Sequence, residues 1–396
     1  MLKKSNIVIL FFLALIILGA AFYYFKNSKK TIRIAPAAET AEKEEQNIIS
    51  NPVAQPIFVS GWLPYWEKEK GAASLEGNMD IFNEINPFAF EVNQNGNLLD
   101  IAKINSAPWL KLIKEAKEKN VNIVPTILWG DAAAMHKIFT DKSLMLNHID
   151  AVLLMLEKNN FSGVDIDYEG KDVADRDNFT LFLKSLDEKL KNKNKTLSCT
   201  IEARTQDLPP EGFTGIRAMS WANDLSALNN ICDVIRIMAY DEDFQIYRAR
   251  NFEKTSEIPT VSNADIRWVE DVVKYSLKYI APEKFMLGVP TYGWEFSFEK
   301  ISKGHDYTRV KSVSYPEAVE KAQKVNVIPI RTDGGELSFV YKTSGEQHIV
   351  VFSDAESVRQ KIELAKKFNL KGISIFKIDG LADSQLYPML KDEIIK

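Results

Sequence analysis

Short apolar runs alternate with longer amphipathic stretches along the chain from residue 57 onward, and this alternation most constrains the fold. Apolar runs rich in β-branched and aromatic residues, each followed by helical periodicity, are typical of βα units on a parallel sheet. Eight such runs occur, beginning at Ile57, Pro87, Asn122, Gly163, Leu197, Asp233, Phe285 and Gly372. The first seven starts are 30 to 52 residues apart, which fits one strand, one helix and two loops. We therefore predict an α/β fold in which residues 57–396 form a (β/α)8 TIM barrel. A doubly wound open sheet is the alternative, but no glycine-rich phosphate loop follows the first run.

The interval between the last two runs is 87 residues, which is too long for one crossover helix. Within it, residues 315–324 have helical periodicity, while IPIRT, ELSFVYK and EQHIVVF have the character of strands joined by glycine-containing turns. We predict a small α+β insertion between strands seven and eight, at about residues 297–352. This insertion either walls a groove at the barrel mouth or serves only as structural padding.

The N-terminal segment differs from the rest of the chain in charge and hydropathy. Residues 7–25 carry no charge, are long enough to span a hydrocarbon core, and precede a basic cluster. We expect residues 1–25 to form a transmembrane helix that anchors the chain in the membrane; the alternative is a signal peptide cleaved near Ala21. Residues 26–56, with three prolines and four glutamates in no amphipathic period, are expected to be a flexible linker. The barrel would then lie outside the cytoplasm, membrane-anchored or secreted after cleavage.

Composition excludes several classes of partner and site. The chain has 50 Lys and Arg against 54 Asp and Glu, and residues 1–33 hold six of the basic residues and no acid, so the remainder carries 44 minus 54, or −10. An acidic body argues against nucleic acid as a partner. Cys199 and Cys232 are the two cysteines, which excludes a disulfide-rich framework and a Cys-rich zinc site. Their apolar surroundings predict two buried free thiols.

The fourth apolar run, GVDIDYE, is the most informative stretch for function. Asp165, Asp167 and Glu169 alternate with apolar residues, so strand geometry directs the three carboxylates to one side. In a barrel strand that side is the interior, where repulsion and lost hydration leave at least one carboxyl protonated near neutral pH. Burying these carboxyls costs stability, and at the C-terminal end of a barrel strand, where active sites of this fold lie, that cost indicates a catalytic role. The alternatives are a solvated edge strand and a structural ion-pair network, although the run contains no Lys or Arg to serve as a partner.

The same acids do not form a recognisable metal site. The four histidines, His136, His148, His305 and His348, stand in no ligand-like spacing with the acidic run. They are expected to be surface or helix residues, and a metal-dependent hydrolase would need ligands that the pattern does not supply.

Four stretches, in this order, resemble the motifs of glycoside hydrolase family 18, the chitinase-like family. Residues 162–169 (SGVDIDYE) resemble its strand-four signature DGxDxDxE, with Ser162 in place of the first Asp. Residues 238–241 (MAYD) resemble the strand-six MxYD motif, and residues 287–294 (LGVPTYGW) resemble the strand-seven pattern. Residues 350–376 resemble the helix and last strand that follow the family's inserted subdomain. The resemblance extends from about Ile57 to the C-terminus and is nearest to the bacterial cell-wall and spore-cortex hydrolases of the family.

The resemblance implies a glycosidase that cleaves a β-linked N-acetylglucosamine polymer, chitin-type or peptidoglycan, with retention and without a cofactor. Glu169 would be the general acid, with its pKa raised by the anionic neighbours on its strand. Asp167 would orient the substrate's 2-acetamido group, whose carbonyl oxygen attacks the anomeric carbon to give an oxazolinium intermediate. Asp165 would share a proton with Asp167, and Tyr240 would donate a hydrogen bond to the acetamido carbonyl.

Sugar rings stack on aromatic side chains, and several aromatic residues follow the predicted strands. The predicted substrate-binding residues are Trp62, Tyr65, Trp129, Glu202, Met238, Asp241, Trp294 and Phe376, and Arg204 is a further polar candidate. Phe376 stands where family members usually carry a Trp, which implies reduced activity or an altered substrate. The rival hypothesis is a catalytically weak or silent glycan-binding protein, although silent members typically lose the acid that is present here as Glu169. The expected partners are an N-acetylglucosamine polysaccharide and, through the N-terminal helix, the membrane, with the chain as a monomer.

Overall fold

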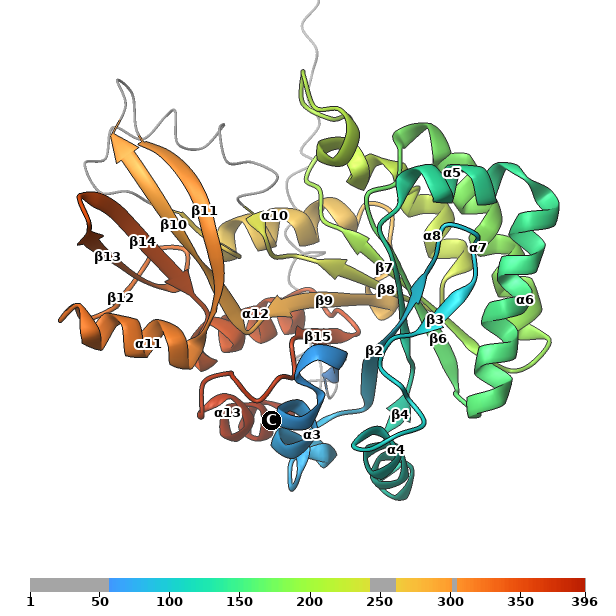
Figure 1. Cartoon of the computed structure of the whole chain (residues 1–396), viewed down its shortest axis with the longest axis horizontal. Helices are drawn as coiled ribbons and strands as arrows, with labels where there is room; N and C mark the ends of the chain where they lie inside the picture. The colour runs from blue at the N-terminus through green and yellow to red at the C-terminus, as the bar shows by residue number, and fades with distance from the viewer. Residues whose placement is uncertain (1–56, 243–260, 301–304, 396) are drawn as a thin grey trace, which may run out of the picture. The chain divides into compact units, whose positions relative to one another are not determined.

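Eight parallel strands close into a barrel in the computed structural model, which describes residues 57–242, 261–300 and 305–395 (Figure 1). The expected anchor (residues 1–25) and linker (residues 26–56) lie outside the described residues. Among the helices of the described part of the chain, none is both long and apolar enough to cross a membrane.

The barrel strands follow the chain order of the eight predicted runs. They are β1 (Phe58–Pro64), β2 (Glu84–Val92), β5 (Thr126–Trp129), β6 (Gly163–Tyr168), β7 (Thr196–Glu202), β8 (Val234–Met238), β9 (Phe285–Pro290) and β15 (Gly372–Phe376). β1 pairs in parallel with both β2 and β15, which closes the sheet. Two short strands extend it: β4 (Asn122–Ile123) pairs with β2 ahead of β5, and β3 (Leu98–Asp100) runs antiparallel to the end of β2. The closed parallel sheet is that of a (β/α)8 barrel, so the open-sheet alternative is wrong.

Helices connect the strands and cover the outer face of the barrel. They are α3 (Lys68–Leu75), α4 (Trp109–Glu118), α5 (Ala132–Thr140), α6 (Lys142–Asn159), α7 (Arg176–Lys191), α8 (Leu225–Ile231), α10 (Ile266–Ser276), α12 (Ala355–Lys367) and α13 (Leu386–Ile395). Short 3-10 segments are η1 (Tyr65–Glu67), η2 (Met79–Ile81), η3 (Val173–Asp175), η4 (Gly215–Ala222) and η5 (Pro282–Lys284). Local signals set the ends of α6: the Asp141 carboxylate accepts from two backbone N–H groups at its start, and Asn160 ends it in the left-handed region. That left-handed turn brings the chain back to the start of β6.

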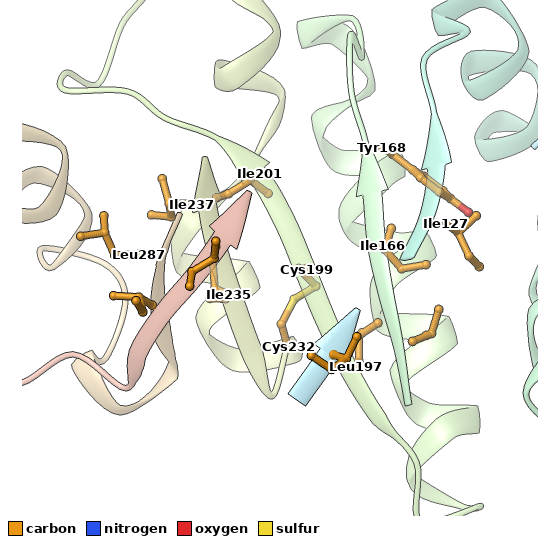
Figure 2. Packing of buried hydrophobic residues seen from close by; sticks show 14 of the residues in the cluster. Ile127, Ile166, Tyr168, Leu197, Cys199, Ile201, Cys232, Ile235, Ile237 and Leu287 are labelled. Atoms are coloured by element: carbon orange, nitrogen blue, oxygen red, sulfur yellow. A yellow bond between two sulfur atoms is a disulfide. The ribbon is translucent and has the colours of Figure 1, made fainter. Parts of the chain in front are cut away.

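The main core lies between the barrel and its helices. Alternate residues of each strand point outward into it, among them Ile166 and Tyr168 of β6 and Ile235 and Ile237 of β8 (Figure 2). The inward-facing residues of β6, Asp165 and Asp167, are buried inside the barrel. The predicted division of the β6 side chains between the two faces is therefore confirmed.

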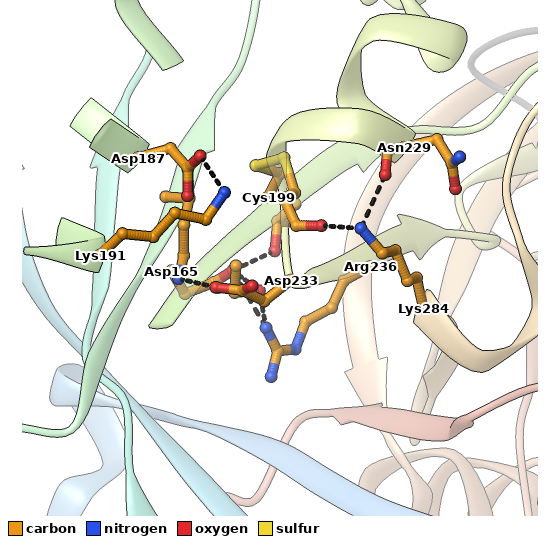
Figure 3. The surroundings of a disulfide bond; sticks show 12 residues. Asp165, Asp187, Lys191, Cys199, Asn229, Asp233, Arg236 and Lys284 are labelled. Carbon is orange, nitrogen blue, oxygen red and sulfur yellow. Dashed lines mark hydrogen bonds and ion pairs between the residues drawn. A yellow bond between two sulfur atoms is a disulfide. The ribbon is translucent and has the colours of Figure 1, made fainter. Parts of the chain in front are cut away.

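Cys199 and Cys232 form a disulfide within this outer core, with their Cα atoms 6.1 Å apart (Figure 3). Cys199 points outward from β7, and Cys232 ends α8 just before β8, the strand that pairs with β7. The prediction of two free thiols is wrong, because the α8 connection returns Cys232 to the strand next to that of Cys199. This proximity depends on the strand order and leaves no mark in the sequence around either cysteine.

The insertion between β9 and β15 is a second, antiparallel sheet packed with one helix. Its strands are β10 (Tyr292–Lys300), β11 (His305–Ser314), β12 (Ile330–Arg331), β13 (Leu337–Thr343) and β14 (Glu346–Phe352), in the order β11-β10-β14-β13-β12. The helix α11 (Tyr315–Lys324) has the predicted bounds and begins with a capping box formed by Ser314 and Glu317. β10 and β11 were not among the predicted strands, and β10 begins at Tyr292, directly after the barrel strand β9.

Candidate active site

A cavity of about 380 Å³ opens where the barrel strands reach their C-terminal ends. Eight of its lining residues were predicted as site residues: Trp62, Asp167, Glu169, Glu202, Met238, Tyr240, Asp241 and Phe376. Five others complete the lining: Phe88, Gly130, Gly170, Met219 and Arg309. The cavity thus combines carboxylates, a phenol and aromatic faces at the end of a barrel where active sites of this fold lie.

Asp165 lies below the cavity and is fully buried. Its two carboxylate oxygens accept hydrogen bonds from Trp62 Nε1 (3.1 Å), Thr126 Oγ1 (2.9 Å), Ser198 Oγ (2.8 Å), Thr200 Oγ1 (2.8 Å) and Arg236 Nη1 (3.3 Å). Every one of these partners donates, so both oxygens of Asp165 are arranged as acceptors. Arg236 supplies the cation that the acidic run itself lacks, and it does so from β8, two strands away in the sheet.

Asp167 lies one inward position further along β6 and lines the cavity. Its side chain is buried, and its Oδ1 atom has no hydrogen-bond partner among the described residues. Burial raises the pKa of Asp167 well above its usual range, and the neighbouring charges of Glu169, Asp165 and Glu202 raise it further. This shift favours the protonated form of Asp167, in the direction that the acidic alternation predicts for the strand.

Glu169 follows the end of β6, where its backbone N–H donates to the Trp129 carbonyl (2.8 Å). Burial raises the pKa of Glu169 to about 7, and the charges of Glu202 and Asp241 add to the rise while Lys171 opposes it. The sequence predicted a raised pKa but gave the wrong cause. The neighbours on the strand are less important than burial and than two carboxylates from other strands.

Glu202 ends β7 and faces the same part of the cavity. Its carboxylate accepts from Asn223 Nδ2 (2.7 Å) and from the Gly170 N–H (3.4 Å), and it lies 3.8 Å from the Lys171 ammonium. Both side chains of this ion pair are buried. These contacts hold the Glu202 side chain in place beside Asp167 and Glu169, the two carboxyls whose pKa values it raises.

Tyr240 follows β8, lines the same cavity and stacks on Phe376, with ring centroids 5.5 Å apart and planes at 15°. A Cβ atom at Gly288 of β9 would lie 2.5 Å from the Ile237 carbonyl oxygen and 3.1 Å from the Tyr240 ring, so glycine leaves the space that this phenol occupies. Burial raises the pKa of Tyr240 well above its usual range, and Asp167 and Glu169 add to the rise. The phenol therefore remains a hydrogen-bond donor at neutral pH.

Asp241 holds a left-handed backbone conformation, with φ of 56°, next to Tyr240. Its backbone N–H donates to Asn263 Oδ1 (3.0 Å), and its Oδ1 atom accepts from Tyr292 Oη and Trp294 Nε1, both at 2.7 Å. These contacts fix the Asp241 carboxylate at the mouth of the cavity, with the two aromatic donors coming from the insertion strand β10.

Four residues predicted to bind substrate do not line the cavity. Trp129 pairs with Tyr168 across β5 and β6 and shares its outward direction, so it packs on Tyr168, with ring centroids 5.3 Å apart, in the helix-side core. Tyr65 lies in η1 and packs on Trp66. Trp294 contacts lining residues without lining the cavity itself: its Nε1 donates to Asp241 Oδ1 (2.7 Å), and its ring lies under the Arg309 guanidinium. Arg204 donates to the Ser220 carbonyl (2.8 Å) and lies over the Tyr275 ring.

Three larger side chains in the cavity lining were missed. Phe88 lies in the predicted second strand, and the aromatic alternation PFAF was the available signal. Met219 lies in η4 and Arg309 in β11, two elements that no periodicity in the sequence marked. Arg309 places its guanidinium 3.9 Å from the centre of the Trp294 ring, so the insertion contributes one wall of the cavity. This supports the groove-walling role over structural padding.

The described residues contain no group of three or more His, Cys, Asp or Glu side chains arranged to hold a metal ion.

The chain matches a protein-family model, a curated relative and two solved structures. The family model described as glycosyl hydrolases family 18 matches residues 84–380. The cortical fragment-lytic enzyme of Bacillus anthracis is 28% identical over 317 residues, a match that covers 76% of this chain and 66% of the relative.

Two solved structures share the fold. The spore cortex-lytic enzyme SleL of Bacillus megaterium has a TM-score of 0.69 at 20% identity, covering 86% of this chain and 75% of that one. The chitinase of Chromobacterium violaceum has a TM-score of 0.68 at 19% identity, covering 86% and 99%.

Proposed function

Since the chain belongs to glycosyl hydrolases family 18 and is a glycosidase, we propose that it cleaves β-linked N-acetylglucosamine-containing polysaccharide, chitin-type or peptidoglycan, by a substrate-assisted retaining mechanism. The observation that carries the proposal is that two carboxyls with raised pKa values, Asp167 and Glu169, line one cavity together with the buried phenol of Tyr240.

Glu169 is the general acid of the proposed reaction. A pKa of about 7 leaves a large fraction of this carboxyl protonated at neutral pH, so it can protonate the glycosidic oxygen as the bond to the leaving sugar breaks. The resulting carboxylate is the base that later activates water to open the intermediate.

The nucleophile is the substrate's own acetamido oxygen, which attacks the anomeric carbon and closes an oxazolinium ring. Protonated Asp167 orients the acetamido group from one side, and the Tyr240 hydroxyl donates to its carbonyl from the other. Both groups are buried in the unliganded site, so the polar contacts that the acetamido group would make there are not in competition with bulk water. An N-acetyl group on the sugar at the cleaved bond is therefore required.

Aromatic faces bind the sugar rings. Phe376, held flat against Tyr240, lies under the position of the scissile sugar, and Trp62 and Phe88 extend the apolar surface along the cavity. Phe376 offers a smaller face than an indole and no N–H donor, so we expect weaker binding at this position and not a loss of the reaction.

We propose that the catalytic domain works outside the cytoplasm, tethered by the N-terminal apolar segment or secreted after its cleavage. The Cys199–Cys232 disulfide supports this location, because disulfides persist in oxidising compartments and are rare in the cytosol. A wall or cortex polymer would be met on that side of the membrane.

Replacement of the general acid tests the function. Glu169→Gln keeps the size of the side chain and removes the proton, and we expect at least a thousandfold loss of kcat on N-acetylated oligosaccharides with binding still measurable by calorimetry. Undiminished turnover in this variant would refute the assigned role. Absence of turnover in the wild type, with retained binding, would instead favour the weak or silent glycan-binding protein.

A thiazoline analogue of the oxazolinium ion tests the mechanism separately. We expect competitive inhibition of the active enzyme, because the analogue resembles a species that forms only when the acetamido group participates. An active enzyme that is indifferent to this compound would exclude the substrate-assisted route.

A further inference from the structure

Arg236 is a fully buried arginine below the cavity, and the reaction proposed above assigns it no role. It extends from β8 into the barrel interior and contacts carboxylates of two different strands, of which Figure 3 shows Asp165. Nη2 donates to Glu84 of β2, and Nη1 donates to Asp165 of β6 (3.3 Å) and to Ser198 of β7. One side chain thus joins three other strands at the base of the acidic file formed by Asp165, Asp167 and Glu169.

The charge balance of this interior is uneven. The acidic groups are Glu84 on β2, the acidic file on β6, Glu202 on β7 and Asp241 after β8, and the Tyr240 phenol also faces the file. The cations are Arg236 on β8, Lys171 after β6 and Lys371 before β15. The other strands around the network, β1, β5, β9 and β15, contribute no ionisable side chain to it. Lys171 pairs with Glu202, so Arg236 is the cation in direct contact with Asp165.

A purely structural role does not account for this arrangement. Burying an ion pair is a poor source of stability, because the loss of hydration offsets the Coulombic attraction. Glu84 already contacts the guanidinium and receives a hydrogen bond from Asn86 Nδ2 (2.8 Å), although burial raises the pKa of Glu84. The additional contact with Asp165 therefore needs its own explanation, and the neighbour of Asp165 on the acidic file is the carboxyl that orients the acetamido group.

We propose that Arg236 is a positioning residue that holds Asp165 as a carboxylate, and so keeps the proton of the acidic file on Asp167. This inference rests on the proposed function. With Asp165 anionic and both of its oxygens engaged as acceptors, ionisation of Asp167 would place two negative charges in adjacent inward positions. Without the guanidinium, Asp165 competes for the proton, and Asp167 can no longer hold the acetamido group in the reactive orientation.

Four variants separate this role from a structural one. Arg236→Met leaves Glu84 buried without its cation, so the double variant Arg236→Met/Glu84→Gln is the main test, because it removes both members of the pair. Glu84→Gln alone leaves Asp165 as the single carboxylate on the guanidinium. Arg236→Lys keeps the charge but lacks the planar fork that spans both carboxylates. Arg331→Met breaks the Arg331–Asp354 ion pair, which lies outside the cavity lining, and is the matched control.

The readouts are kcat, KM and the pH dependence of kcat/KM on an N-acetylated oligosaccharide, with the melting temperature measured for each variant. For the double variant we expect kcat to fall at least tenfold, KM to stay within about threefold, and the acidic limb to move about one pH unit higher, because Asp165 then takes up a proton more readily. Glu84→Gln should move the acidic limb to lower pH, because Asp165 is then the single carboxylate on the guanidinium. Arg236→Lys should keep the acidic limb at its wild-type pH and retain part of the wild-type kcat. Arg331→Met should change neither the acidic limb nor kcat.

The opposite signs for the double variant and Glu84→Gln are the decisive feature. An acidic limb that does not move in the double variant, at any kcat, would overturn the inference, as would an upward shift in Glu84→Gln. If the double variant does not fold, the comparison of Glu84→Gln with Arg236→Lys decides in the same way. Failure of the proposed function is a different result, since Glu169→Gln would then retain the turnover of the wild type.

Discussion

Glu202→Gln offers the sharpest electrostatic test of the proposed general acid. After burial, the charge of Glu202 is the largest cause of the raised pKa of Glu169. Asn223 Nδ2 and the Gly170 N–H donate to different oxygens of the Glu202 carboxylate. Glutamine removes the charge and keeps the size of the side chain, and with its amide oxygen toward Asn223 it retains the shorter of the two bonds (2.7 Å). It also leaves Lys171, which lies 3.8 Å from the Glu202 carboxylate, without its partner.

The sign and the magnitude follow from these contacts. Loss of a neighbouring anion, and release of the Lys171 charge, both make the ionised form of Glu169 less unfavourable, so its pKa falls. A like charge at close range typically shifts a pKa by about 1–3 units. Because Lys171 already offsets part of the Glu202 charge in the wild type, we expect a fall of about one unit, from about 7 to about 6. This shift corresponds to about 1.4 kcal/mol.

The pH profile of kcat/KM measures this shift, because its basic limb reports the acid that must be protonated in the free enzyme. We expect the limb of Glu202→Gln to move about one pH unit lower, so that the variant is roughly tenfold slower than the wild type at pH 8 and within about twofold of it at pH 5. Asp187→Asn is the control, because it removes a buried carboxylate that is paired with Lys191 on α7, away from the cavity. A basic limb that stays in place or moves higher would refute the assignment of Glu169 and its electrostatic cause.

Two further predictions concern stability and location. Burial lowers the pKa of His148 from 6.5 to about 4, so the neutral ring, hydrogen-bonded to Tyr168 Oη and the Gly96 carbonyl, contributes stability that is complete above pH 6.5 and is lost as the pH falls toward 4. Urea unfolding should show a loss of about 2–3 kcal/mol between pH 7 and 4.5 that His148→Gln largely removes, and an equal pH dependence in the variant would contradict this. The full-length chain should fractionate with membranes until residues 1–30 are deleted, whereas a soluble mature protein trimmed near Ala21 would favour the signal peptide.

The barrel could be predicted because each of its strands and helices has a pattern within its own short stretch of sequence. Each of the eight runs combines β-branched or aromatic residues with a following helical period, and each lies on a strand of the closed sheet. Part of the insertion was predictable for the same reason, since α11 carries both its period and its capping residues. β10 was missed because LGVPTYGW reads as one run, although the barrel strand ends at Pro290 and the insertion strand begins at Tyr292.

The errors came from contacts between segments far apart in the chain. Trp129 stands at the end of a strand, as a sugar-stacking residue would, but its register with Tyr168 turns it outward. Cys199 and Cys232 are 33 residues apart, and only the pairing of β7 with β8 brings them together. Arg309 reaches the cavity because the insertion folds back over the barrel mouth. None of these three placements can be predicted from the residues that stand next to the side chain in the sequence.

The properties of the acidic strand, residues 163–169, depend both on its local sequence pattern and on contacts with distant segments. Alternation along residues 163–169 was sufficient to place three carboxylates on one face and to require a proton among them. Which carboxyl carries that proton is decided elsewhere: Arg236, 71 residues from Asp165, engages the deepest carboxylate, while Glu202 and Asp241 act on the outermost one. The middle carboxyl, Asp167, has charge on both sides and an oxygen without a partner among the described residues, so it has the strongest reason to remain protonated. The sequence of one strand can therefore predict that one of its carboxyls is protonated, whereas contacts from the neighbouring strands of the barrel determine which carboxyl it is.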